Sequence, residues 1–104
     1  MKQDLYEQYL NELHEELKVG KVRENTYKSN RADLNTLYAY IKTSGYKTEK
    51  EFFTNVTQTD INQFVEELQQ KYKPSTYNRK MATFKKFFNY IIDNTSMITV
   101  NFFN

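Results

Sequence analysis

The apolar residues of this chain recur with the period of an α-helix along almost its whole length. They are spaced three and four residues apart in four segments, so that within each segment they share one face. The 104 residues include only two glycines and one proline, which leaves few of the residues that loops and β-turns require. The pattern predicts an all-α fold with main helices near residues 5–18, 25–44, 60–72 and 75–93.

Residues that start or stop helices stand near the ends of these segments. Gly20 and Gly45 follow the first two helices, and Pro74 prevents the third from continuing. The N-cap of the third helix is expected at Thr59 or Asp60. The side chains expected to be among the most buried are Leu34, Leu37, Phe64, Leu68, Phe84 and Phe88.

Two stretches lie outside the four main helices. Thr48 and Glu51 have the spacing of a capping box, which predicts a short turn of helix between the second and third helices. That turn would bury Phe52, Phe53 and Val56. The tail over residues 96–104 is apolar without a helical period, and packing on the bundle, a strand and a linker are all open for it.

Charge is distributed unevenly along the chain. Residues 1–20 contain two basic and five acidic residues, a net −3, whereas residues 21–104 contain thirteen basic and eight acidic residues, a net +5. Residues 71–86 contain six basic residues and no acidic one. This asymmetry favours a polyanionic partner, with a plain solvated surface as the alternative.

The second and fourth predicted helices have similar polar faces opposite their apolar stripes. On a helical wheel these faces carry small, hydroxylated and basic residues, and each helix opens with a Thr-Tyr pair. Small residues let another molecule approach the backbone, and long basic side chains can then reach phosphates. The side chains predicted to contact nucleic acid are Thr26, Lys28, Ser29, Arg31, Ala32, Asn35, Thr36, Ser75, Thr76, Asn78, Arg79, Lys80, Thr83 and Lys86. Of these, Lys28, Arg31, Arg79 and Lys86 are expected to be exposed and to contribute little to stability.

Three stretches of the chain resemble, in order, the core-binding domain of tyrosine recombinases of the phage-integrase type. They are ENTYKSNRADLNTLYAYIK, VTQTDINQFVEELQQ and KPSTYNRKMATFKKFFNYIIDNTSMITVN. The resemblance covers about residues 5–101 and is most specific in TYNRKMATFKKFFNYII. It implies a SAM-like orthogonal bundle of four helices, whose second and fourth helices face the major groove of recombination-site DNA.

The resemblance also carries expectations about domains and partners. It implies that residues 1–100 form the DNA-binding domain and that residues 101–104 begin a linker to a catalytic domain that this chain lacks. One departure is that Asn101 precedes Phe102, where the family usually has Asn-Pro. The implied partners are double-stranded DNA and, in the full-length recombinase, other protomers on that DNA. The isolated domain is expected to be a monomer.

Other functions find less support in the residues. His14 is the only histidine, no cysteine is present, and catalysis, a metal site and a cofactor are therefore not expected in this chain. The first residues lack the apolar run of a signal peptide and no stretch is long and apolar enough to span a membrane, so a soluble, cytoplasmic protein is expected. A helical protein-interaction module is the main alternative. Binding of RNA or single strands is a weaker one, because the aromatic residues fall on the apolar stripes.

Overall fold

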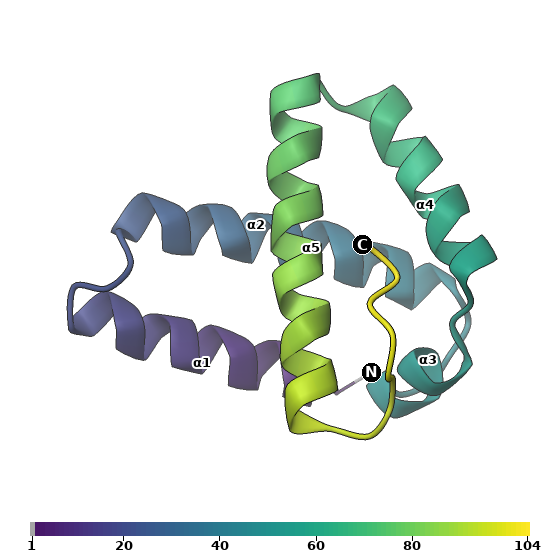
Figure 1. Ribbon diagram of the computed structural model, residues 1–104, viewed down its shortest axis with the longest axis horizontal. Helices are drawn as coiled ribbons and strands as arrows, with labels where there is room; N and C mark the ends of the chain where they lie inside the picture. The colour runs from purple at the N-terminus through teal and green to yellow at the C-terminus, as the bar shows by residue number, and fades with distance from the viewer. Residues whose placement is uncertain (1) are drawn as a thin grey trace.

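The computed structural model describes residues 2–104, which form five α-helices and no β-strand (Figure 1). The helices are α1 (Asp4–Lys18), α2 (Glu24–Thr43), α3 (Glu49–Asn55), α4 (Gln58–Lys71) and α5 (Pro74–Asn94). The all-α prediction is therefore confirmed for this part of the chain. The count of four helices is not, because the turn predicted after Thr48 is a seven-residue helix, α3.

The helix α5 is central to the arrangement. In Figure 1 α1 and α2 lie side by side in opposite directions, and α5 runs across both of them with α4 on its other side. The structure accordingly has contacts from α5 to α1, α2 and α4. The glycines that end α1 and α2, Gly20 and Gly45, have φ values of 79° and 87°, a region that only glycine adopts without strain.

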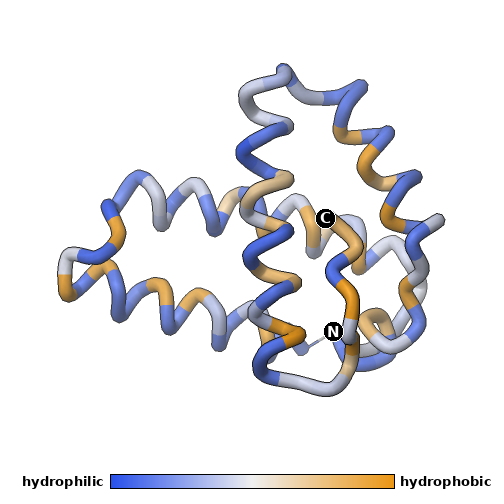
Figure 2. The backbone as a smooth tube through the Cα atoms, viewed as in Figure 1, coloured by the Kyte–Doolittle hydropathy of each residue, from blue (hydrophilic) through white to orange (hydrophobic). Residues whose placement is uncertain are grey.

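The core is built largely from aromatic and branched aliphatic side chains. All six residues predicted to be most buried are buried, with Leu34, Leu37, Phe84 and Phe88 at 0% exposure. Phe87, which is not among these six residues, is also 0% exposed. Figure 2 shows hydrophobic positions recurring along each helix rather than in one continuous run. In residues 2–104 no helix is both long enough and apolar enough to cross a membrane.

The start of α4 differs from the prediction by two residues. Its N-cap is Thr57, and Thr59 and Asp60 lie inside the helix. The Thr57 hydroxyl accepts the Asp60 N–H at 3.2 Å, and the Thr57 N–H donates to the Asp60 carboxylate at 3.1 Å. This reciprocal capping box satisfies two backbone donors at once, which explains why the helix begins at the earlier threonine.

A buried carboxylate fastens the start of α1 to the rest of the bundle. Glu49, 5% exposed, accepts the Leu5 N–H at 3.0 Å and the Tyr6 N–H at 3.3 Å, and it also accepts the Tyr38 hydroxyl. Burial, followed by this hydrogen bond, raises the pKa of Tyr38 far above its usual value. Glu49 therefore caps α1 from a different helix, which joins α1, α2 and α3.

The tail after α5 packs on the bundle. Ile98 is buried, and the Phe103 ring lies 4.8 Å from that of Phe88. The Asn101 side chain donates to the Lys85 carbonyl at 2.8 Å and to the Asn89 side-chain oxygen at 2.9 Å. Of the three alternatives left open for the tail, packing on the bundle is the one observed. The linker expected from residue 101 stays a prediction.

Candidate nucleic-acid interface

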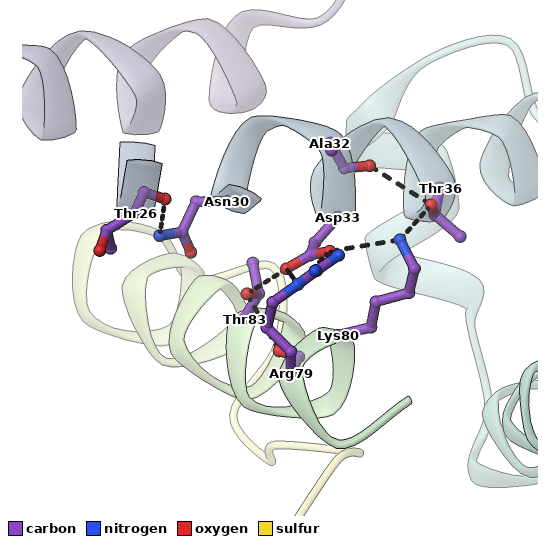
Figure 3. A network of polar contacts seen from close by, with 8 residues as sticks. All are labelled: Thr26, Asn30, Ala32, Asp33, Thr36, Arg79, Lys80 and Thr83. Carbon is purple, nitrogen blue, oxygen red and sulfur yellow. Dashed lines mark hydrogen bonds and ion pairs between the residues drawn. The ribbon is translucent and has the colours of Figure 1, made fainter. Parts of the chain in front are cut away.

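A buried carboxylate organises the place where α2 and α5 cross. Asp33 of α2 is 0% exposed and points toward α5, as Figure 3 shows. Arg79 donates from Nε to both carboxylate oxygens at 3.2 Å and from Nη2 to Oδ1 at 2.7 Å. Lys80 donates to Oδ1 at 3.2 Å, and the Thr83 hydroxyl donates to Oδ2 at 2.8 Å. The carboxylate is thus surrounded by donors, as a buried charge requires.

The helical repeat explains why these residues meet. Asp33 precedes Leu37 and Ile41 by four and eight residues, so it shares their buried face of α2. On α5, Thr83 and Phe87 follow Lys80 by three and seven residues and form a second buried face beside the predicted apolar stripe. The two faces pack against each other, and the polar residues meet at the crossing.

Two predicted contact residues are not on the surface. Lys80 is 4% and Thr83 is 5% exposed, so the prediction that they are available to a partner is wrong. The reason is that α5 packs against several helices, whereas a single apolar stripe implies only one buried side. The Lys80 ammonium donates to the Thr36 hydroxyl at 2.8 Å and lies 4.9 Å from the centre of the Tyr72 ring.

Arg79 is partly exposed but not a free cation. Its side chain is 46% exposed, and its hydrogen bonds with Asp33 raise its pKa above the usual value. A guanidinium has five N–H groups; Nε–H and one Nη2–H bond Asp33, which leaves three. These contacts argue against the expectation that removing Arg79 would leave stability unchanged, because the buried Asp33 carboxylate would lose two of its N–H donors.

The remaining predicted residues lie along the two helices at or near the surface. Those that are exposed are Thr26, Lys28, Arg31, Ala32, Asn35, Ser75, Asn78 and Lys86, and those partly buried are Ser29, Thr36 and Thr76. Lys28 pairs with Glu24 at 3.3 Å on the surface. Lys86, one helical turn after Thr83, lines a hollow between α1 and α5 together with Glu12 and Glu16.

Comparison with known families identifies the chain. A family model described as "Phage integrase, N-terminal SAM-like domain" matches residues 4–95. The chain belongs to this family. The match begins with α1 and ends just after α5, so it spans the whole set of helices. No curated protein and no solved structure matched the chain.

The resemblance found in the sequence is thereby confirmed. This is the N-terminal SAM-like part of a phage integrase and not the catalytic domain. Membership of the family implies interaction with DNA in general. Among residues 2–104 of this integrase domain, no three acidic or histidine side chains are grouped as ligands for a metal ion.

Sequence reasoning missed two residues that hold side chains of the candidate interface in place in this integrase domain. Asp33 was not singled out, although an acid on the apolar face of a helix signals a buried partner. The other is Tyr6 of α1, whose hydroxyl donates to the side-chain oxygen of Asn35 at 2.5 Å. No local pattern indicates this second contact, because the two residues are 29 positions apart.

Proposed function

We propose that this integrase domain binds double-stranded DNA through the exposed faces of α2 and α5. Strand cleavage would belong to a separate catalytic domain of a tyrosine recombinase. The observation that carries the proposal is the charge at the crossing, where two cations, Arg79 and Lys80, share one carboxylate, Asp33. The family match supports the same partner.

Small side chains beside the crossing support close approach of a duplex. Ser75 and Ala82 lie one helical turn on either side of Arg79, and Ser29 and Ala32 neighbour Asp33 on α2. Arg31 of α2 is exposed and has no ion pair among the described residues. Such a surface brings phosphates within reach of basic side chains and leaves room for the groove edge.

A protein-interaction module is the second candidate, and one hollow favours it. Glu12, Glu16 and Asp93 line the space between α1 and α5 beside Tyr9 and Tyr90. Burial, and then the charges of Glu16 and Glu12, raise the pKa of Tyr9. This acidic, aromatic surface suits a basic protein segment better than it suits DNA. Binding to generic duplex DNA in dilute buffer separates the two candidates, because an interaction module would not bind it.

DNA affinity is expected to fall steeply as salt rises. Each phosphate neutralised by a basic side chain releases counterions, so the logarithm of the binding constant should fall by about 0.9 per log unit of salt for each phosphate contact. Titration of a fluorescently labelled duplex at a series of salt concentrations measures this slope. Affinity that does not change with salt, or no binding even in dilute buffer, would count against the proposal.

Charge removal on the proposed face should weaken DNA binding more than the same change elsewhere. Arg31→Ala and Lys28→Ala are the test variants, and Lys47→Ala and Lys50→Ala are controls, since all four side chains are exposed. Loss of one phosphate contact should reduce the salt slope by about one, while stability stays within about 0.5 kcal/mol. Lys28 should have the smaller effect because Glu24 already offsets its charge.

The comparison of the four variants decides the location of the surface. Equal losses for the controls and the test variants would show that α2 does not face DNA. Lys86→Ala is informative in a different way, because this lysine lies beside Glu12 and Glu16. A small effect of Lys86→Ala with a large effect of Arg31→Ala would restrict the contact to α2 and exclude the part of α5 beside the acidic hollow.

A further inference from the structure

We propose that the α2–α5 crossing forms a preformed site for a single phosphate group, with Arg79 as its ligand and Asp33 as the residue that positions Arg79. The inference rests on the proposed DNA binding, for which it names the kind of contact made at this point. The ligand is a phosphodiester of the DNA backbone.

The charges at the crossing do not balance. Asp33 is the acidic partner of both Arg79 and Lys80, and no other ion pair of either cation occurs among the described residues. The crossing therefore carries one net positive charge. A charge in a partly desolvated place interacts more strongly than one in water, so an anion from outside is favoured there.

The excess charge is accessible only through Arg79. The Lys80 side chain is 5% exposed, and its ammonium is already occupied by Asp33, the Thr36 hydroxyl and the Tyr72 ring. The Arg79 side chain is 46% exposed and has three N–H groups beyond those that bond Asp33. An incoming anion thus meets a guanidinium, whose planar fork matches two phosphate oxygens.

The guanidinium is held before the ligand arrives. Asp33 takes Nε–H and one Nη2–H, which leaves the edge formed by the two terminal nitrogens for a ligand. Asp33 is itself fixed by the Thr83 hydroxyl at 2.8 Å. Because the side chain is already ordered, less conformational entropy is lost on binding than for a mobile lysine.

A phosphate suits the site better than a base edge does. A guanine edge also offers two acceptors to an arginine, but it carries no charge to offset the excess at the crossing. The small neighbours of Arg79, Ser75 and Ala82, leave room for a tetrahedral anion. The site is therefore expected to bind inorganic phosphate by itself, without any nucleotide sequence.

The test is a titration of the ¹⁵N-labelled domain with inorganic phosphate, in which sodium chloride keeps the ionic strength constant. The Arg79 Nε–H signal should shift in a saturable way. Phosphate at ten times its Kd should raise the ratio of folded to unfolded protein about elevenfold. Arg79→Gln should lose both effects, and Lys47→Gln, at an exposed lysine, should retain them. No saturable shift, or an equal effect in Arg79→Gln, would overturn the proposal. If Arg79→Gln does not fold, Arg79→Lys serves instead, because lysine keeps the positive charge but lacks the planar guanidinium. Unchanged phosphate affinity in Arg79→Lys would also overturn the proposal.

The phosphate affinity of Asp33→Asn distinguishes a positioning role of Asp33 from a purely electrostatic one, because the two roles predict changes in opposite directions. Asp33→Asn removes a negative charge, so electrostatics alone predicts tighter phosphate binding. A positioning role predicts weaker binding, because Arg79 loses the group that orients it. Thr83→Val, which removes one hydrogen bond to Asp33, should weaken binding in the same direction and serves if Asp33→Asn does not fold. Tighter binding in either variant contradicts the positioning role.

Duplex DNA tested with the same variants separates this inference from the proposed function. If DNA binds with a steep salt dependence but Arg79→Gln binds it as well as the wild type does, the phosphate site is wrong and the proposed function stands. If inorganic phosphate binds at Arg79 but duplex DNA does not bind, the phosphate site stands, but the proposed function and the assignment of its ligand to the DNA backbone are wrong.

Discussion

Truncating Phe88 to alanine should destabilise the domain by about 3–5 kcal/mol, enough to threaten the folding of a domain of ordinary stability. Phe88 is 0% exposed and lies at the centre of a cluster of rings, with centroid distances of 5.6 Å to Phe53, 6.3 Å to Phe102 and 4.8 Å to Phe103. Removing the ring leaves a cavity that helices α3 and α5 and the tail would have to close together. Urea or thermal unfolding followed by circular dichroism measures the loss.

Two further variants make this result interpretable. Phe88→Leu keeps most of the apolar volume and should cost less than Phe88→Ala, so it supplies a value if the alanine variant does not fold. Val19→Ala is the surface control, because Val19 is 69% exposed and its truncation should change stability by no more than about 0.5 kcal/mol. A cost for Phe88→Ala as small as that for Val19→Ala would show that the aromatic cluster does not hold the tail and α5 together.

Helix positions could be read from the sequence because the core is periodic. Leu34 and Leu37 on α2, and Phe84 and Phe88 on α5, repeat at three and four residues, and all are buried. The start of a helix was harder to predict where two residues cap it together, as in a capping box. Thr57 precedes Asp60 by three residues, and this pair starts α4 earlier than either residue considered alone would indicate.

The central position of α5 could not be read from its own sequence. A helical wheel assumes one buried side, and it placed Thr83 on the exposed side of this helix. In the fold α5 packs against α1, α2 and α4, so a second side, which includes Thr83 and Phe87, is also buried. Polar residues are kept there because partners on α2 satisfy them, and only the tertiary arrangement provides those partners.

The two buried carboxylates differ in how far the sequence indicates that they are buried. Asp33 lies on an apolar face, a position that indicates a buried acid, but its partner Arg79 is 46 residues away and could not be chosen from local spacing. Glu49 stands in a polar stretch before Phe52 and was not distinguishable from a solvated residue. Its role depends on the start of α1, which lies 44 residues earlier. Contacts at such separations are set by how the helices pack.

Asp33→Asn should cost about 3–5 kcal/mol, because it breaks a buried ion pair and leaves the buried Lys80 ammonium without its carboxylate. An asparagine has nearly the same shape, so the loss reports charge and hydrogen bonding and not a cavity. It also offers the Arg79 and Lys80 donors one neutral oxygen in place of two charged ones. Thermal and urea unfolding measure the change, with Asp93→Asn at an exposed acid as the control that should stay within about 0.5 kcal/mol.

A double variant tests whether the cost arises from the unpaired lysine. Lys80→Met removes the buried ammonium and keeps a long apolar side chain against the Tyr72 ring, which lies 4.9 Å from the lysine nitrogen. Combining it with Asp33→Asn should recover part of the stability, because replacing both members of a buried pair costs less than removing one. The two changes should therefore be non-additive by more than about 0.5 kcal/mol. Strict additivity would show that Asp33 and Lys80 do not depend on each other.

A cost for Asp33→Asn no larger than for Asp93→Asn would mean that the carboxylate does not hold α2 to α5, and Arg79 would then have no fixed support at the crossing.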